Sequence, residues 1–518
     1  MDSSALLHAE QLLRHAGWIP GVLALLATVG WRESVAAGLP PEPQGRSMVI
    51  TRLGIVATSQ VLASRAGAQV LELGGNAVDA AIAANAVLGV VEPMSDGIGG
   101  DLFAIIYEAK TGKLHGLNAS GWAPAAMTLD FVRRRGYQTM PQDGILTVTV
   151  PGCVAGWGVL RRQYGKLPMQ TLLASAIYYA REGFPVTERI STAWKGLEQR
   201  KDPDPELRRV FLPGGRAPAV GEVFRNPDLA ASLERIAARG REGFYRGPTS
   251  AAILELSRRA GGAMEAADLT EFQPEWVEPI STTYRGWKVY ELPPNGQGIA
   301  ALMMLGMMQQ FPLAEYGHNS ARALHVMIEA KKLAYADLLR YVADPRFSDV
   351  PVAAMLSHEH ANSRAKEIDP TRAKSSVAPT AAADLKAKRA GDTVYLTAID
   401  KDGNIVSLIQ SVYSGFGAKL VALGTGFALQ NRGALFSLEP GHPNVLAPHK
   451  RPVHTIIPAF MERGDVKIGF GIMGGWNQAQ AHAQFVSNVV DFGMNIQAAL
   501  ESPRFTKISF EGLDVEME

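Results

Sequence analysis

The sequence predicts a protein of mixed helices and strands whose site is built from the loops between them. The 52 glycines and 31 prolines among 518 residues imply many tight turns between short elements. Apolar residues recur at helical spacing from Gln60 to Val91, with Gly74 to Asn76 as the turn between two helices. Leu102 to Tyr107 has the composition of a buried strand. At this length, one large core and two closely packed halves both fit the chain.

Composition narrows the class of partner. An apolar fraction of 47% excludes wholesale disorder. The 51 lysines and arginines nearly balance the 50 aspartates and glutamates, so no global field attracts nucleic acid or an anionic membrane. We therefore expect a small-molecule partner and no nucleic-acid partner.

The N-terminal region carries features of a targeting signal. Residues 18–31 are apolar, Arg14 precedes them, and small residues follow at a distance suited to a signal peptidase. The apolar run is too short to span a bilayer as a helix, and Pro20 interrupts it. We expect residues 1–47 to be an N-terminal extension and linker with no stable membrane span, in a cytoplasmic protein. The alternative is a periplasmic or secreted protein, if residues 14–37 act as a signal.

The clearest boundary inside the chain lies near residue 392. Residues 375–391 are rich in alanine, serine, lysine and threonine without apolar periodicity, which indicates an exposed segment. The residues that follow predict a strand at 393–399, a turn at 400–404 and a second strand at 405–413. A cut where the exposed segment meets the first strand would leave the fold intact.

A glycine run near the C-terminus matches the dinucleotide-binding fingerprint. Gly469, Gly471 and Gly474 have the required spacing, follow the strand-like residues 466–470 and precede Asp491 at a suitable distance. The run lies too close to the C-terminus for a complete dinucleotide domain, however, and a lone match is common by chance. A nucleotide-binding enzyme is therefore only the third hypothesis.

Metal and cysteine chemistry are not predicted. The run His358-Glu359-His360 resembles part of a zinc-binding helix, but Asn362 occupies the position of the second ligand, so we interpret the run as a solvated helix. Cys153 is the only cysteine, which excludes an intrachain disulfide and fits a small buried side chain. The sequence has neither a phosphate-binding loop nor a G-x-S-x-G motif. We expect no metal and no organic cofactor.

Thr393 stands where the exposed segment meets the predicted strand, in the run Gly391-Asp392-Thr393. A threonine hydroxyl is a poor nucleophile unless a base lies beside it. Cleavage before Thr393 would supply that base as a free α-amine, whose pKa is about 8. The alternative from the local sequence alone is that Thr393 is a β-branched residue that opens a strand.

Several motifs taken together decide between these interpretations. The runs are ELGGNAVDAA at 72–81, DGIGGDLF at 96–103, DTVYLTAIDKDGN at 392–404, KRPVHTIIPA at 450–459 and MGG at 473–475. They occur in the order seen in the γ-glutamyltransferase (glutathione hydrolase) family, which the sequence resembles from about Met48 to Phe505. Separate motifs in register are far more specific than any one of them.

This resemblance implies an α+β fold, the four-layer αββα sandwich of the N-terminal-nucleophile hydrolases, formed by a precursor that cuts itself. The cut lies between Asp392 and Thr393, which implies a large subunit of residues 48–392 and a small subunit of residues 393–518. The family continues for several dozen residues after the stretch that matches 502–505. We therefore expect a C-terminally shortened small subunit with a sheet edge or core face uncovered.

The resemblance also assigns the reacting groups. By it Thr393 is the nucleophile and attacks the Asp392 carbonyl during its own release. Ser411 stands where the family has a second threonine that hydrogen-bonds the nucleophile, so a hydroxyl is retained. Gly474 and Gly475 match the pair whose backbone N–H groups form the oxyanion hole, and glycine lets the backbone come close to the developing charge.

The residues that would hold a γ-glutamyl group depart from the family pattern. Ser120 replaces the arginine that binds its α-carboxylate, and Leu435 replaces the acid that receives its α-ammonium. His454 and Thr455 replace a serine pair, and Tyr413 replaces a substrate-contacting asparagine. Because a zwitterionic head needs both opposite charges, the cutting machinery is kept while the γ-glutamyl recognition set is largely missing.

Arg432, beside the retained Asn431, is the cation placed to bind an acidic substrate; the alternative is a structural arginine in a turn. The runs NRG, HTIIPA and MGG, with Gln480 and His482 after them, resemble the branch that contains oxamate amidohydrolase and cephalosporin acylases. Those enzymes hydrolyse amides of small acids that lack an amino-acid head. We predict a self-processing amidohydrolase for such substrates. The alternatives are a true glutathione hydrolase and transpeptidase, and an unprocessed binding protein with the same fold.

Overall fold

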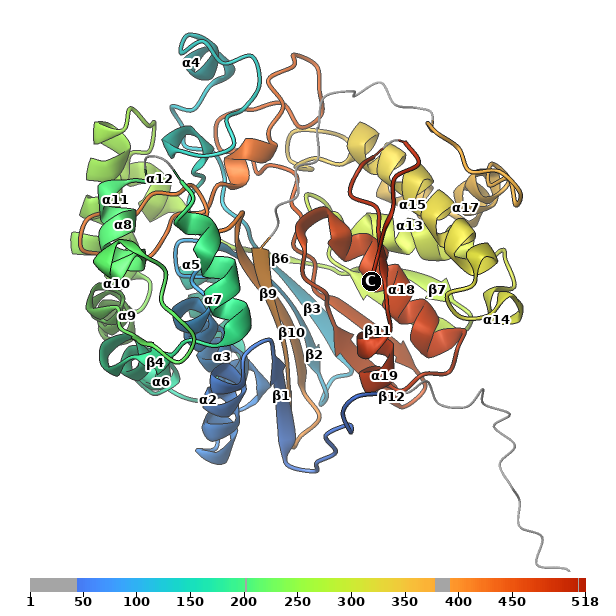
Figure 1. Ribbon diagram of the computed structural model, residues 1–518, viewed down its shortest axis with the longest axis horizontal. Helices are drawn as coiled ribbons and strands as arrows, with labels where there is room; N and C mark the ends of the chain where they lie inside the picture. The colour runs from blue at the N-terminus through green and yellow to red at the C-terminus, as the bar shows by residue number, and fades with distance from the viewer. Residues whose placement is uncertain (1–43, 201–202, 378–391, 511) are drawn as a thin grey trace, which may run out of the picture. The chain divides into compact units, whose positions relative to one another are not determined.

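The structure, a computed structural model, describes residues 44–200, 203–377, 392–510 and 512–518. Within these residues a six-stranded and a four-stranded antiparallel sheet face each other, and helices cover the outer face of each sheet (Figure 1). The fold is α+β with four layers in the order helix, sheet, sheet, helix, which confirms the expected architecture. The apolar run at 18–31 and most of the segment before residue 392 lie outside the described residues.

The six-stranded sheet carries the predicted β-hairpin at its centre. The strand order is β1–β9–β10–β2–β3–β6. The strands are β1 (Gly54–Thr58), β9 (Asp392–Asp400), β10 (Ile405–Tyr413), β2 (Asp101–Glu108), β3 (Lys113–Ala119) and β6 (Glu275–Val277). The strands predicted at 102–107, 393–399 and 405–413 are thus confirmed. The Asp400 carboxylate closes the predicted turn, because it accepts hydrogen bonds from the N–H groups of Asp402 and Asn404.

The four-stranded sheet packs against the inner face of the first. Its order is β12–β11–β8–β7. The strands are β12 (Val466–Phe470), β11 (Ala459–Arg463), β8 (Trp287–Glu291) and β7 (Ile280–Tyr284). The space between the two sheets is filled by buried apolar side chains, including Phe103, Ile105, Ile405, Ile409, Ile456 and Phe460.

Alternation along β9 determines which of its side chains face the second sheet. Val394 and Leu396 belong to the core beneath the helices, whereas Tyr395 and Ile399 pack between the two sheets. Thr393 has the same parity as Tyr395, so its side chain lies on the inner face at the end of the strand. The position of the predicted nucleophile therefore follows from the hydrophobic pattern of β9.

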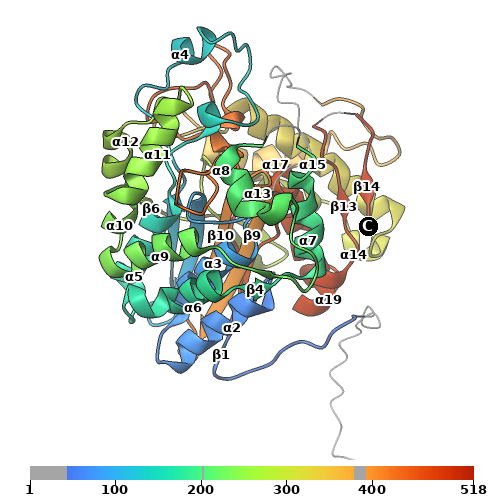
Figure 2. The ribbon, with the colours of Figure 1, turned by 60° about the vertical axis from the view of Figure 1, so that its left-hand side comes forward.

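The helix layer on the first sheet is built around α3 (Ala77–Val91). Its sequence is apolar all round and nearly all of it is buried, as expected for a helix between a sheet and other helices. Asn76 and Asp79 form a capping box at its start, directly after the predicted turn from α2 (Val61–Glu72). Figure 2 brings this side forward. The other helices of this part are α4 (Leu129–Arg133), α5 (Cys153–Tyr164), α6 (Met169–Glu182), α7 (Glu188–Trp194), α8 (Pro205–Phe211), α9 (Pro227–Arg239), α10 (Glu242–Tyr245), α11 (Pro248–Arg259) and α12 (Ala266–Glu271), with the short pair β4 (Phe184–Pro185) and β5 (Val223–Phe224).

The second helix layer covers the four-stranded sheet. Its apolar centre is α13 (Gly298–Met308), which is buried along almost its whole length. Around it lie α14 (Leu313–Tyr316), α15 (Ala321–Tyr341), α16 (Val352–Met355), α17 (His358–Ala365), α18 (Gln478–Val490) and α19 (Ile496–Glu501), followed by the strand pair β13 (Phe505–Thr506) and β14 (Glu516–Met517). Among the helices of the described ranges, none combines the length and the apolar character that crossing a membrane requires.

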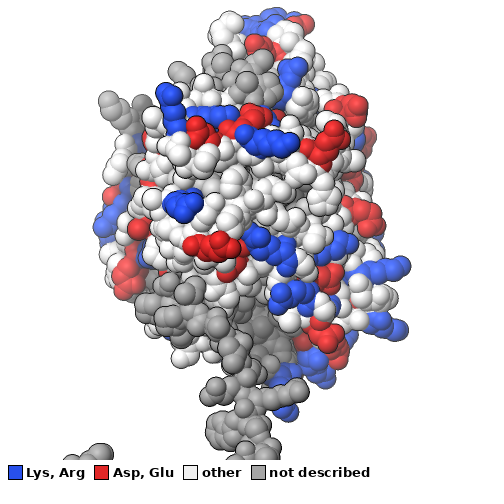
Figure 3. Space-filling view, turned by 90° about the vertical axis from the view of Figure 1, so that its right-hand side faces the viewer, with Lys and Arg blue, Asp and Glu red and all other residues white. Residues whose placement is uncertain are grey.

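Charges are mixed on the outer face of this second layer. Figure 3 shows lysine and arginine side chains interspersed with aspartate and glutamate over the described part of that face. This mixing agrees with the nearly equal numbers of basic and acidic residues. The face shown has no extended basic surface of the kind that binds nucleic acid.

Two glycines test the packing of α5 on β3: Gly152 precedes the helix and Gly158 lies within it. An added methyl group at Gly152 would lie 1.8 Å from the Ala119 carbonyl oxygen, whereas one at Gly158 meets nothing within 4 Å. We predict that Gly152→Ala lowers the free energy of unfolding by about 3 kcal/mol, because backbone must shift. Gly158→Ala is expected to raise it by up to about 1 kcal/mol. Denaturant unfolding measures both values, and equal effects would contradict this packing.

Candidate active site

Thr393 lies at the N-terminal end of β9, on the face that looks toward the second sheet. The residue is 4% exposed. The preceding residue, Asp392, is paired with Tyr413 at the end of β10. The predicted cleavage bond is therefore held in the sheet. Burial raises the pKa of the Asp392 carboxyl group, and the nearby Lys419 ammonium opposes this shift.

A one-way chain of hydrogen bonds passes through the Thr393 hydroxyl. The side-chain N–H of Gln478 donates to Thr393 Oγ1 at 3.5 Å, and Thr393 Oγ1 donates to Ser411 Oγ at 3.3 Å. Ser411 Oγ donates in turn to the Asp392 carbonyl oxygen at 2.7 Å and accepts from the Tyr413 N–H, also at 2.7 Å. Because Ser411 has one proton and accepts twice, that proton points at the Asp392 carbonyl. The carbonyl group of the predicted cleavage bond is thereby polarised.

A β-bulge aims the Ser411 hydroxyl. Pairing between β10 and β9 is regular as far as Gln410, and the register shifts between Gln410 and Tyr413, while Ser411 still pairs with Asp101 of β2. The φ angle of Tyr413 is 80°, in the left-handed region that a bulky side chain rarely adopts. Bulges and strained backbone of this kind redirect side chains beside functional sites. Here they bring one hydroxyl within reach of both Thr393 and Asp392.

Gly474 and Gly475 lie in the connection between β12 and α18. Their φ angles are 116° and 58°, which glycine adopts without strain. Within the described residues, neither backbone N–H donates a hydrogen bond to a protein group. Gly475 also opens the short helix Gly475–Asn477, where the first N–H groups have no helical acceptor. Two backbone N–H groups that have no protein acceptor can stabilise a developing negative charge.

Gln297 connects this glycine pair to the opposite wall of the site. Its Nε2 donates to the Thr455 carbonyl oxygen at 2.5 Å and to the Gly475 carbonyl oxygen at 2.7 Å. The Tyr335 hydroxyl donates to the next carbonyl, that of Trp476. These buried bonds hold the C-terminal side of the glycine pair. The sequence carried no signal for Gln297, because a glutamine before a helix has no distinctive spacing.

Arg432 is fully buried at the start of the short helix Arg432–Leu435. Its Nη1 donates to Thr455 Oγ1 at 2.7 Å, and its guanidinium carbon lies 4.5 Å from the centre of the Tyr413 ring. Its Nε lies 3.6 Å from Asp101 Oδ2. Within the described residues, Nη2 has no hydrogen-bond partner. Burial lowers the pKa of Arg432 to about 10, so the side chain remains a cation at neutral pH.

Asp101 carries the negative charge that lies next to Arg432. Its Oδ2 accepts from His454 Nε2 at 2.9 Å, and its Oδ1 accepts from the Gly121 N–H at 2.8 Å. His454 Nδ1 accepts from the Ile456 N–H at 3.3 Å, so the single ring proton is on Nε2. Burial lowers the pKa of His454 to about 4, which keeps the imidazole neutral. Both ring nitrogens of His454 thus form hydrogen bonds within the protein. Asp101 belongs to the motif at 96–103, but the sequence alone did not identify it as a site residue.

The side chains of Asn431 and Ser120 also form hydrogen bonds with other protein groups. Asn431 Nδ2 donates to the Gln142 carbonyl oxygen and to Ser414 Oγ, at 2.8 and 2.7 Å, and its Oδ1 accepts from the Ser414 N–H at 3.1 Å. Ser120 Oγ donates to Asn118 Oδ1 at 2.7 Å. Asn431 therefore holds the segment that follows Tyr413, whereas Ser120 is bonded to Asn118 at the end of β3.

The other motifs of the sequence lie in ordinary structural contexts. The glycine run at 469–474 begins inside β12, which pairs antiparallel with β11, whereas dinucleotide binding needs a parallel unit. Asp491 is paired with Arg285. His360 Nε2 in α17 lies 3.1 Å from Asp337 Oδ2, and the described ranges hold no group of three side chains suited to a metal.

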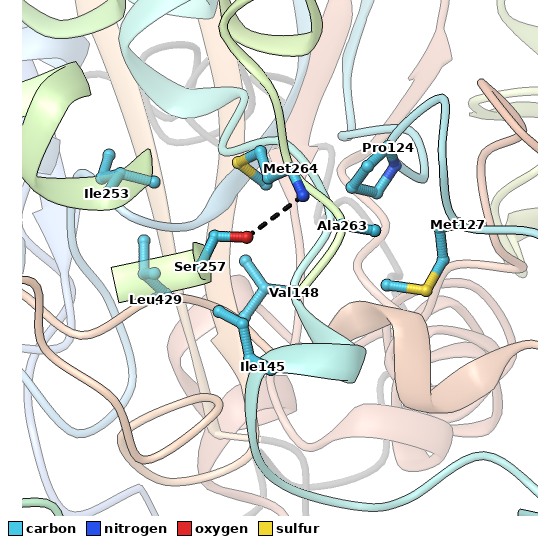
Figure 4. Close-up of a pocket in the computed structure, with 9 residues that line it drawn as sticks. All are labelled: Pro124, Met127, Ile145, Val148, Ile253, Ser257, Ala263, Met264 and Leu429. Atoms are coloured by element: carbon cyan, nitrogen blue, oxygen red, sulfur yellow. Dashed lines mark hydrogen bonds between the residues drawn. The ribbon is translucent and has the colours of Figure 1, made fainter. Parts of the chain in front are cut away.

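Two cavities elsewhere are lined by none of the predicted site residues. Figure 4 shows the first, which is almost entirely apolar and in which Ser257 Oγ accepts from the Met264 N–H at 3.1 Å. The second, of about 500 Å³, lies at the far end of the β9–β10 hairpin, beside Asp402 and Asn404. Neither of these two cavities contains the groups that lie around Thr393.

Comparison with known proteins agrees with this geometry. The family model for gamma-glutamyltranspeptidase matches residues 63–518. The glutathione hydrolase-like YwrD proenzyme of Bacillus subtilis (strain 168) is 36% identical over 476 residues, covering 90% of this chain and 88% of that protein. The oxamate amidohydrolase proenzyme of Klebsiella pneumoniae is 34% identical over 461 residues, covering 87% and 84%.

A solved structure is similar as well. The crystal structure of cephalosporin acylase from Bacillus halodurans is 44% identical, with a TM-score of 0.85 over 92% of this chain and 88% of that chain. The sequence motifs, the four layers and the matched lengths point the same way. The chain belongs to the gamma-glutamyltranspeptidase family of self-processing, N-terminal-nucleophile amide hydrolases.

Proposed function

We propose that the chain cuts itself between Asp392 and Thr393 and then hydrolyses amides of small acids. The large subunit would be residues 48–392 and the small subunit residues 393–518. The observation that carries the proposal is the hydrogen-bond chain from Thr393 through Ser411 to the Asp392 carbonyl. That chain joins the attacking hydroxyl to the bond that is cut. One nucleophile would then serve both maturation and turnover.

Self-cleavage begins when Thr393 Oγ1 attacks the carbonyl carbon of Asp392. The Thr393 hydroxyl proton passes to Ser411 Oγ while the Ser411 proton passes to the carbonyl oxygen, so no net charge builds up. The C–N bond breaks as the Thr393 nitrogen takes up that proton, which leaves Asp392 joined to Thr393 Oγ1 as an ester. Water then hydrolyses the ester. This releases the new backbone carboxylate of Asp392 and leaves Thr393 as a free N-terminus with its α-amine.

Turnover repeats the attack on an external amide. The freed α-amine takes the proton of the Thr393 hydroxyl, which then attacks the substrate carbonyl carbon. The N–H groups of Gly474 and Gly475 hold the negative oxygen of the tetrahedral intermediate. The leaving amine departs with the proton, and water releases the acid from Thr393. No step requires a metal or an organic cofactor.

The charges around the site support an acidic substrate without an amino-acid head. Arg432 is a buried cation with an open N–H donor, and the Thr455 hydroxyl beside it keeps its own proton for donation. At the position where an acid would receive an α-ammonium, Leu435 is packed in the apolar core with Tyr413. Burying an unpaired ammonium there would cost several kcal/mol. We therefore assign the substrate carboxylate to Arg432 and Thr455.

The other candidate is a glutathione hydrolase that grips the γ-glutamyl group differently. It is favoured by the 36% identity to a glutathione hydrolase-like proenzyme. In this alternative the maturation steps are the same, and only the recognition of the acyl group differs. Substrate comparison therefore separates the two candidates.

Ser411 variants test the proton transfer of maturation. We predict that Ser411→Ala slows self-cleavage by about a hundredfold, because the scissile carbonyl loses its donor. Ser411→Thr keeps the hydroxyl and should mature at a rate close to wild type. The fraction of cut chain on denaturing gels, followed from freshly purified precursor, gives both rates. An alanine variant that matures as fast as wild type would exclude the proposed relay.

Substrate comparison tests the proposed specificity. We predict that kcat/KM is higher for oxamate or glutaryl-p-nitroanilide than for γ-glutamyl-p-nitroanilide; rapid cleavage of the γ-glutamyl compound alone would favour the glutathione hydrolase.

Arg432→Lys keeps a charge opposite Asp101 but loses the planar pair of donors. It should raise KM for the preferred acid about tenfold, with a smaller change in kcat. An unchanged KM would remove Arg432 from the binding site.

A further inference from the structure

His482 bridges residues 471–475, the oxyanion loop that carries Gly474 and Gly475, to the second sheet. It lies in α18 and is 1% exposed. Its Nε2 accepts a hydrogen bond from the Ile472 N–H at 3.1 Å, and its Nδ1 contacts Glu291 Oε1 at 2.7 Å. Ile472 lies two residues before Gly474, and Glu291 is the last residue of β8. One imidazole thus links the strand, the helix and the loop.

The direction of these bonds fixes the tautomer of His482. An amide N–H can only donate, so Nε2 carries no proton and accepts from Ile472. The proton must then be on Nδ1, which donates to Glu291. Glu291 is completely buried, and burial raises the pKa of its carboxyl group. Its second oxygen, Oε2, has no hydrogen-bond partner within the described residues. The carboxyl group therefore serves His482 alone, which is the usual way in which a second residue orients an imidazole.

The Ile472 bond holds the backbone of the loop on the N-terminal side of the glycine pair. On the C-terminal side, Gln297 and Tyr335 bind the carbonyl groups of Gly475 and Trp476. On the N-terminal side, β12 ends at Phe470, the Ile472 side chain packs in the core and Met473 is 37% exposed, so the Ile472 N–H bond fixes the backbone where strand pairing has ended. A shift of Ile472 would be passed directly to the peptide groups of the glycine pair.

We propose that His482, with its tautomer set by Glu291, is a positioning residue that holds the oxyanion loop in its reactive conformation. This inference rests on the proposed function in one respect, namely that the N–H groups of Gly474 and Gly475 bind the oxyanion. Neither Glu291 nor His482 touches the reacting atoms. Their effect is transmitted through one backbone hydrogen bond, and displacement of catalytic groups by about 1 Å can slow a reaction about a hundredfold.

Two amide variants separate the two ends of the imidazole. Asparagine places its polar atoms near Nδ1, so His482→Asn keeps a donor to Glu291 but does not reach Ile472. Glutamine reaches the position of Nε2, so His482→Gln restores an acceptor for the Ile472 N–H. Both variants are uncharged, and both should cut at Asp392 and Thr393 like the wild type, because maturation uses Ser411 instead of the glycine pair.

We expect His482→Asn to lower kcat for glutaryl-p-nitroanilide between about tenfold and a hundredfold. KM should stay within about threefold of wild type, because no substrate-binding group is lost. Amide hydrogen exchange of the peptide covering residues 470–475 should accelerate in His482→Asn only. His482→Gln should stay within about threefold of wild type in kcat and keep its exchange protection.

Other outcomes would overturn the inference. A His482→Asn protein with faster exchange but wild-type kcat would show that the loop bond does not serve turnover. Equal loss of kcat in both variants would point to a role that the acceptor does not restore. If the wild type hydrolyses none of the tested anilides, the proposed function fails, and the exchange comparison alone decides on the loop bond. Equal exchange in all three proteins would then exclude it.

Discussion

The Ser411 hydroxyl lies between the hydroxyl of Thr393, the proposed nucleophile, and the carbonyl group of Asp392, and the rest of the proposed site depends on this contact. It exists because β9 and β10 form the central hairpin of the larger sheet, and because a bulge turns Ser411 toward the end of β9. The second sheet covers the same face, where Thr393 and Ser411 are buried. A hydroxyl network of this kind is electrostatically stronger in a buried place than in water.

The residues proposed for catalysis and those proposed for substrate recognition occupy different parts of the fold. Thr393 and Ser411 lie on paired strands, and the glycine pair leads into a helix, so their geometry is held by regular hydrogen bonding. Arg432 and Thr455 lie on connecting segments, supported by the buried Asp101. Because loops tolerate substitution better than paired strands, recognition can change while the cutting groups stay in place. The replacement of a charged position by Leu435 fits this separation.

The sequence predicted the elements whose signals are local. The helical spacing from Gln60 to Val91 and the strand composition of residues 393–399 are local signals, and both elements form where expected. The reacting residues were predicted only through motifs in family order. The contacts that complete the site join distant segments, such as His454 to Asp101 across 353 positions, and no local pattern reports them. For the same reason, the sequence predicted the positions of Asn431 and His454 but not that their polar atoms bind protein groups.

The central claim is that Thr393 becomes a free N-terminus through its own hydroxyl. Intact-mass analysis of the purified protein, with N-terminal sequencing of each fragment, tests it most directly against the Thr393→Ala variant. The account predicts a wild-type small fragment that begins at Thr393, and an alanine variant that stays a single chain near 55.6 kDa. A wild-type protein cut elsewhere, or an alanine variant cut at the same bond, would contradict the account.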